Sequence, residues 1–132
     1  RYHVLTDERT DITRLGVVGD PTERQIGELR RARELVEENI GRLKPGVQFK
    51  TLTCHFHGIG LDAIEAPFGG MVGKAVHGEW FVREGMVLCV EQNNYLDTGE
   101  VFAYEAIAVI RKDGPEVITL ADPGLQRIRT VG

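Results

Sequence analysis

The sequence has little of what marks several large classes of protein. Its 132 residues contain only two cysteines, Cys54 and Cys89, which lie far apart, so a disulfide framework is not indicated. We expect both to be reduced thiols that serve as small core residues. No apolar run approaches the ~20 residues that a membrane-spanning helix needs, and no signal peptide is visible. We therefore expect no membrane partner and a cytoplasmic location.

An excess of positive charge is also missing. The formal net charge is −4, which argues against nucleic acid as the main partner, because a basic face would be expected there. The basic run at residues 30–33 is interleaved with glutamates and is typical of a solvated helix face. Hydrophobic residues make up 42% of the chain, enough for one domain over residues 1–132 to bury a core.

One segment has the pattern of an amphipathic helix. Asp20 fits an N-cap, Pro21 the first helical position and Glu23 the reciprocal capping position. Apolar residues then recur at helical spacing, which predicts a helix over residues 21–43. The Pro-Gly pair at residues 45–46 is expected to stop it.

The remaining patterns favour strands. Residues 1–18 alternate around a polar turn at residues 7–9, which predicts a hairpin. Five further runs are typical of strands: residues 51–57, 79–83, 86–93, 101–112 and 116–120. The sequence therefore predicts an α+β fold in which a mixed or antiparallel sheet is covered by an amphipathic helix. Residues 65–67 remain open to interpretation as an ordinary loop.

Two of these strand-like runs each contain one carboxylate among apolar residues. Glu91 ends residues 85–91, and Glu105 lies within residues 101–110. A lone carboxylate in such a strand is costly to bury unless it is paired, protonated or bound to metal. His57 stands beside a glycine turn, in the run Cys-His-Phe-His-Gly-Ile-Gly-Leu. Together the three indicate a metal centre, although His57 taken alone is more often a satisfied core histidine.

The motifs and their order also resemble the pita-bread metalloenzymes, a superfamily that includes methionine aminopeptidases, Xaa-Pro aminopeptidases, prolidases and creatinase. The matching segments are residues 11–14 with 17–22, 43–47, 57–61, 85–91, Glu105 and 112–119. The resemblance spans nearly all of the chain. It implies an incomplete pita-bread fold with a curved sheet, in which residues 1–132 are the C-terminal portion of the catalytic domain.

The resemblance further implies a dinuclear site of two Asp, one His and two Glu. By motif, Asp11 corresponds to the second Asp, His57 to the histidine, and Glu91 and Glu105 to the two glutamates. The first Asp has no convincing counterpart and is expected before Arg1. This ligand set suits two divalent ions of Mn, Fe, Co or Zn, which activate a water. The implied partners are a small peptide or small-molecule substrate and a second copy in a homodimer.

The chain departs from the peptidase pattern at three places. Ile64 stands where peptidase members carry a substrate-binding histidine, and losing such a donor costs on the order of 10²–10³ in rate. Thr53 replaces a histidine frequent in Xaa-Pro-cleaving members, and Ala106 follows the last glutamate. His55 is the nearest substitute donor, so His55 and Glu91 are the candidate catalytic residues.

Three functions therefore remain open. The first is a metal-dependent hydrolase of the Xaa-Pro peptidase kind. The second is a non-peptidase metalloenzyme of the same fold, either a creatinase-like hydrolase or a dimethylsulfoniopropionate-type lyase. The sequence of the lyase is similar to this chain around Leu88 and Cys89. The third is a metal-free binding module, as in histone-chaperone relatives. Four retained ligand positions and the lack of an acidic tail argue against the third.

Overall fold

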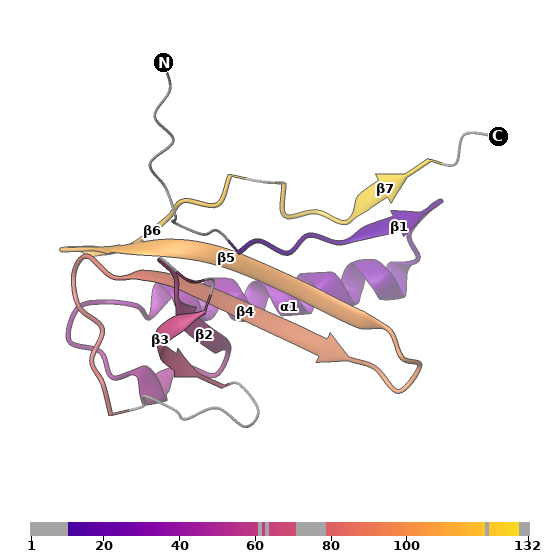
Figure 1. Ribbon diagram of the computed structural model, residues 1–132. Coiled ribbons are helices and arrows are strands. Elements are labelled where there is room, and N and C mark those ends of the chain that lie inside the picture. The colour runs from indigo at the N-terminus through magenta and orange to yellow at the C-terminus, as the bar shows by residue number, and fades with distance from the viewer. Residues whose placement is uncertain (1–10, 61, 63, 71–78, 121, 130–132) are drawn as a thin grey trace, which may run out of the picture.

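The computed structural model describes residues 11–60, 62, 64–70, 79–120 and 122–129 (Figure 1). Its elements in chain order are β1 (Gly16–Val18), α1 (Glu23–Gly41), the 3₁₀ helix η1 (Phe49–Thr51), β2 (His55–Gly58), β3 (Glu65–Gly69), β4 (Val87–Tyr95), β5 (Val101–Arg111), β6 (Gly114–Val117) and β7 (Gln126–Ile128). Five strands form an antiparallel sheet in the order β3-β2-β4-β5-β6. β1 and β7 form a separate parallel pair. The predicted hairpin around residues 7–9 lies outside the described residues.

The helix lies within the predicted span, but its cap differs from the prediction. Thr22, not Asp20, is the N-cap, and its hydroxyl oxygen accepts from the Gln25 backbone N–H at 3.2 Å. The Gln25 side chain accepts from the Thr22 backbone N–H at 2.9 Å, so Gln25 takes the reciprocal role expected of Glu23. Asp20 and Thr22 are both good N-cap residues and lie two positions apart, and the helix begins after the later of them. The helix ends at Gly41, before the predicted stop at residues 45–46.

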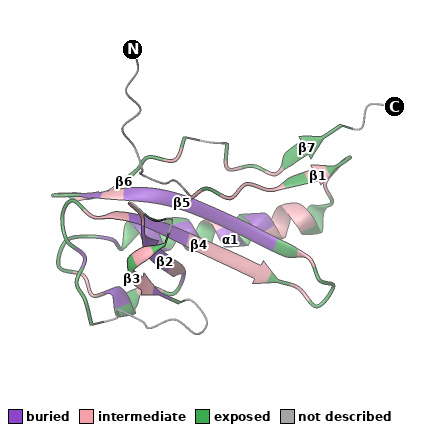
Figure 2. Cartoon of the chain, in the orientation of Figure 1, coloured by how far each residue is buried: buried purple, intermediate pink, exposed green. Residues whose placement is uncertain are grey.

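The core lies between α1 and one face of the sheet. Figure 2 shows β5 buried over most of its length, with α1 packed behind it and β4. The helix contributes Leu29, Ala32, Val36 and Ile40. The sheet contributes Phe56, Leu88, Val90, Phe102, Tyr104, Ala106, Ala108 and Ile110. This alternation, in which every second strand residue enters the core, leaves the intervening residues on the opposite face.

Three strand predictions were partly wrong, among them residues 116–120, of which β6 includes only 116 and 117. Residues 51–57 were expected to be one strand, but the chain turns through η1, and the strand begins only at His55. The turn follows from Phe49, which is fully buried and stacks on Phe56 with ring centroids 4.8 Å apart. The run at residues 79–83 makes only an isolated bridge, between Phe81 and Gln48.

Two further strands, β3 and β7, were not predicted from the sequence. The segment at residues 65–67, left open as a loop, belongs to β3, which pairs with β2 beside His57. β7 was not predicted, because its three residues are all exposed and give no apolar alternation. In the part of the chain that the structure describes, no helix is long and apolar enough to cross a membrane.

Candidate metal centre

The strand register brings four of the five predicted site residues, all except Asp11, to one face of the sheet. Glu91 of β4 is the direct partner of Glu105 on β5 and of His55 on β2. His57 is likewise the direct partner of Cys89. Direct partners in an antiparallel ladder project their side chains from the same face. The residues between them, such as Phe56 and Val90, enter the core against α1, so these five side chains leave the face turned away from the helix.

His57 is held with one ring nitrogen free. Its Nδ1 lies 3.0 Å from the carbonyl oxygen of Gly58, and because a carbonyl only accepts, this places the proton on Nδ1. Nε2 lies 3.9 Å from Oδ2 of Asp11 and is the nitrogen that carries the lone pair when the ring is neutral. The imidazole is almost completely buried, at 2% exposure, whereas Asp11 is at the solvent edge, at 39%. A neutral imidazole in this tautomer is the form that ligates metals.

Glu105 is a buried carboxylate with two different neighbours. The Thr13 hydroxyl donates to Oε2 at 2.8 Å, and the Cys89 thiol donates to Oε1 at 3.2 Å. Burial raises the pKa of Glu105, and the negative charges of Asp11 and Glu91 raise it further, while the two hydrogen bonds oppose the rise. Burial, followed by the charge of Glu105, also raises the pKa of the Cys89 thiol, so the thiol keeps its proton.

Glu91 and His55 form the more open end of the same face. Oε1 of Glu91 lies 3.9 Å from Nδ1 of His55, and Oε2 accepts from the Asn93 amide at 3.3 Å. Their side chains are 19% and 28% exposed, so both reach water while Glu105 does not. Ile64, the residue before β3, is 41% exposed, and its side chain offers no hydrogen-bond donor.

The chemistry of these donors fits divalent ions. Three carboxylates and one imidazole are the oxygen and nitrogen ligands that Mn²⁺, Fe²⁺, Co²⁺ and Zn²⁺ accept. The 3.9 Å between His57 and Asp11 can be bridged by one ion, because each bond to such an ion is about 2.0–2.2 Å. Among the described residues, no three His, Cys, Asp or Glu side chains form a group that holds an ion as they stand. The donors therefore share a face without forming a closed coordination shell.

Sequence reasoning missed three residues of this face. Thr13 was matched only as part of the motif at residues 11–14, Asn93 was given no role in the site, and Cys89 was taken as a small core residue within a lyase-like segment. One signal was present: Cys89 precedes Glu91 by two positions, so strand alternation places both on one face. Thr13 gave no comparable signal, because its contact with Glu105 joins residues 92 apart in the sequence.

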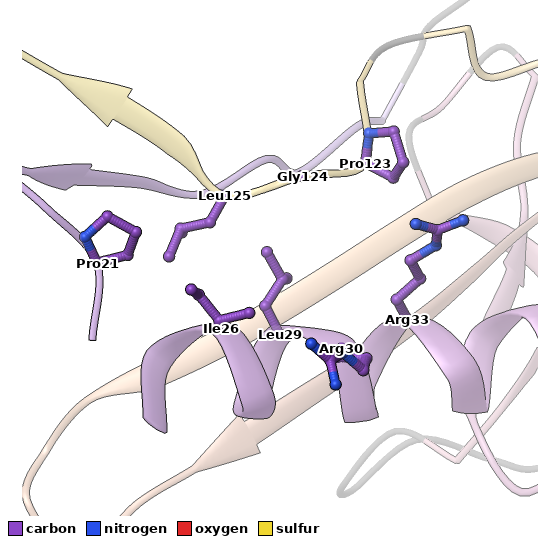
Figure 3. Close-up of a pocket in the computed structure, with 8 residues that line it drawn as sticks. All are labelled: Pro21, Ile26, Leu29, Arg30, Arg33, Pro123, Gly124 and Leu125. Atoms are coloured by element: carbon purple, nitrogen blue, oxygen red, sulfur yellow. The ribbon is translucent and has the colours of Figure 1, made fainter. Parts of the chain in front are cut away.

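Two hollows among the described residues lie away from this face. One, of about 270 Å³, lies between α1 and residues 123–125 (Figure 3). Figure 3 shows Ile26, Leu29 and Leu125 pointing toward one another, with Arg30 and Arg33 further along the helix. The other, of about 340 Å³, is lined by Glu79, Trp80, Phe81, Arg83 and Met86. None of the predicted metal ligands lines either hollow.

Comparison with solved structures places this architecture among known folds. An X-Pro aminopeptidase from Thermotoga maritima is 22% identical, with a TM-score of 0.81 over 92% of this chain and 38% of that chain. A prolidase from Pyrococcus horikoshii is 26% identical, with a TM-score of 0.72 over 88% and 37%. A methionine aminopeptidase from Thermotoga maritima is 21% identical, with a TM-score of 0.55 over 75% and 53%. No family model matches the chain, and no curated protein matches it significantly.

These similarities confirm the fold expected from the sequence. The chain has the pita-bread fold, with an antiparallel curved sheet and one covering helix. It spans a little over a third of the length of the aminopeptidase and prolidase structures cited above, 37–38% of each. The resemblance recognised in the sequence motifs and the three-dimensional similarity therefore point to the same superfamily.

Proposed function

We propose that the protein is a divalent-metal-dependent hydrolase of the Xaa-Pro peptidase kind that acts on a peptide or small amide bond. The observation that carries this proposal is the register that sets Glu91 opposite Glu105, on the face that also holds His57. Structural relatives named as X-Pro aminopeptidase and prolidase support the class of bond. Asp11, which lies beside His57, completes the set of donors in this chain.

The proposed residues would have two roles: some bind the metal ions, and others act on the bound water or the substrate. Asp11, His57, Glu91 and Glu105 would hold two ions of Mn, Co, Fe or Zn, which supply a Lewis acid and a more acidic bound water. Of the two glutamates, Glu91 is the one that would act on the bound water and substrate, because it is partly exposed whereas Glu105 is closed off. His55 lies 3.9 Å from Glu91, at the open end, where it would donate a hydrogen bond to the substrate.

Metal content and turnover test the assignment. We expect the purified protein to take up Mn²⁺ or Co²⁺, and we expect His57→Ala and Glu91→Ala each to reduce the bound metal. His55→Gln is the matched control: it should keep the metal and lose most of the turnover of Xaa-Pro dipeptides. A folded protein that takes up no metal contradicts the proposal and supports the metal-free binding module.

A second candidate function rests on Ile64. An apolar, half-exposed side chain just before β3 suits a substrate that develops no oxyanion there. The protein would then be a creatinase-like hydrolase or a dimethylsulfoniopropionate-type lyase. Ile64→His separates the two. Strong cleavage of Xaa-Pro peptides by the wild type, unchanged or lowered by Ile64→His, eliminates the non-peptidase. Turnover of a small non-peptide amide or sulfonium acid, without any peptide cleavage, eliminates the peptidase.

The expected partners and location belong to the same proposal. A small peptide or small molecule is the substrate, and a homodimer in the cytoplasm is the expected form. Sedimentation equilibrium of the protein, with and without added Mn²⁺, tests the dimer. A monomer at every concentration contradicts it without affecting the metal assignment.

A further inference from the structure

The buried carboxylate of Glu105 has a separate donor for each of its oxygens. Thr13 donates its hydroxyl proton to Oε2 at 2.8 Å, and Cys89 donates its thiol proton to Oε1 at 3.2 Å. Glu105 is 2% exposed and Cys89 is completely buried, so water does not compete freely for these bonds. The last torsion of a glutamate side chain is broad and roughly two-fold, so nothing within Glu105 itself fixes the carboxylate plane.

Each donor is held by a different part of the fold. Cys89 lies inside β4, between His57 on β2 and Ile107 on β5, and its side chain shares their face. Thr13 lies on the segment that precedes β1. That segment is tied to β5 by Arg14, whose guanidinium donates to the Glu105 backbone carbonyl at 2.7 Å and lies over the Tyr104 ring.

We propose that Cys89 and Thr13 are positioning residues, which fix the rotation of the Glu105 carboxylate toward the ions that the four donors would hold. This inference rests on the proposed metal-dependent function. A carboxylate has about four lone-pair sites, and the two hydrogen bonds occupy one on each oxygen, which leaves one on each for an ion. The thiol acts here as a donor to a ligand and not as a ligand itself. Such supporting contacts typically change metal affinity by 10–100-fold when removed.

The thiol–carboxylate bond can be tested in the metal-free protein. In a Cys54→Ser background, Cys89 is the remaining thiol, and its S–H stretching absorption lies in an empty infrared window. We expect Glu105→Gln to shift this band, because an amide oxygen is a weaker acceptor than a carboxylate. Glu100→Gln, at an exposed glutamate paired with Arg24, is the matched control and should leave the band unchanged. A band that Glu105→Gln does not move overturns the inference.

Metal titration calorimetry with Mn²⁺ and Co²⁺ tests the positioning role. Cys89→Ala and Thr13→Val remove a donor, and each should weaken binding by about tenfold. Cys89→Ser and Thr13→Ser keep an O–H donor and should recover most of the affinity. The positioning role is refuted if Cys89→Ala binds metal as tightly as the wild type does. It is also refuted if Cys89→Ser folds but loses as much metal affinity as Cys89→Ala. If Cys89→Ala does not fold, the comparison of Thr13→Val with Thr13→Ser still decides the question.

The spectrum of the Co²⁺-loaded protein separates this role from direct ligation. A positioning thiol gives no sulfur-to-cobalt charge-transfer band, and the appearance of such a band overturns the inference by making Cys89 a ligand. The proposed function fails in a different way, through absence of metal uptake by the wild type. In that case an infrared shift would leave the hydrogen bond as a structural clamp only, which also overturns the positioning role.

Discussion

Glu91 on β4 and Glu105 on β5 face each other directly across two antiparallel strands, so two carboxylates leave the same side of the sheet. Like charges placed directly opposite one another destabilise a sheet unless something neutralises them. Oε1 of Glu105 accepts from a thiol and Oε2 from a hydroxyl, but neither contact supplies positive charge. The metal-free protein therefore keeps an unfavourable pair at the place where we propose that cations bind.

The first prediction concerns this pair in the absence of metal. We expect Glu105→Gln to raise the free energy of unfolding by roughly 0.2–1 kcal/mol at neutral pH, because it removes one of two opposed charges. Urea denaturation in the presence of a chelator measures it. Glu116→Gln, at an exposed glutamate of β6 paired with Arg111, is the control and should give no gain. Equal stability of the wild type and Glu105→Gln at neutral pH contradicts the argument.

The pH dependence of that gain has a definite sign. Burial raises the pKa of Glu105 in the folded protein above its ordinary value of 4.5. A carboxyl whose folded pKa is raised favours folding while it is protonated in both states. This contribution is complete below pH 4.5 and is lost as the pH rises through the higher folded pKa. The gain from Glu105→Gln should therefore be small in acid and should grow with pH.

A second prediction concerns Asn39, a completely buried polar residue of α1. Its side-chain oxygen accepts from the backbone N–H of Thr53 at 2.7 Å, and its amide donates to the Leu35 carbonyl at 2.8 Å. We expect Asn39→Leu to destabilise the protein by about 1–3 kcal/mol, because a buried N–H loses its acceptor. Thermal unfolding measures it. Glu34→Leu, at an exposed position on the same helix, should change stability by less than about 0.5 kcal/mol.

Glycine substitutions give a third prediction with opposite signs at two positions. A Cβ at Gly58 would lie 2.6 Å from the Ala66 carbonyl oxygen, so Gly58→Ala must push β3 away from β2. We expect a loss of about 1–3 kcal/mol, together with weaker metal binding at the adjacent His57. Gly27 lies inside α1 with nothing within 4 Å of the added Cβ, so Gly27→Ala should gain about 0.5–1 kcal/mol. Denaturation midpoints of both variants measure the contrast.

The fourth prediction concerns the thiol of Cys54, which lies three residues before His57 but belongs to the hydrophobic core. Burial raises its pKa to about 11, from an ordinary value of 9.0. Alkylation of native protein at pH 8 should therefore be much slower at Cys54 than in the unfolded chain, as peptide mapping by mass spectrometry would show. Stability should fall between about pH 9 and pH 11, because the unfolded thiol loses its proton first. Cys54→Ser should reduce that fall.

The sequence predicted the parts of the fold that depend on local pattern. The amphipathic helix has clear helical periodicity, and the apolar runs around Glu91 and Glu105 placed these residues within the two long central strands, β4 and β5. The 3₁₀ turn at η1 could not be predicted, because it depends on the stacking of Phe49 on Phe56. The strand β7 could not be predicted either, because it forms only by pairing with β1, more than 100 residues earlier in the chain.

The candidate site was predictable to the same degree. His57, Glu91 and Glu105 stand in motifs whose residue types and spacing indicate metal chemistry. Their common face follows from strand register, which alternation alone does not fix between separate strands. The contact of Thr13 with Glu105 bridges 92 residues and has no local signature. The closeness of His55 to Glu91 likewise depends on how β2 is placed beside β4.

The segment before β1 has a consequence for the order in which the site assembles. β4 and β5 are joined by a short loop, and a hairpin of this kind forms in about 1–10 μs. The opposed pair of Glu91 and Glu105 therefore arises early in folding. Thr13 reaches Glu105 across 92 residues, and Arg14 reaches the Asp122 carbonyl across 108, so these contacts carry a larger loop-closure cost. We expect Glu91 and Glu105 to come together first during folding, and the contacts of Thr13 and Arg14 with Glu105 to form last.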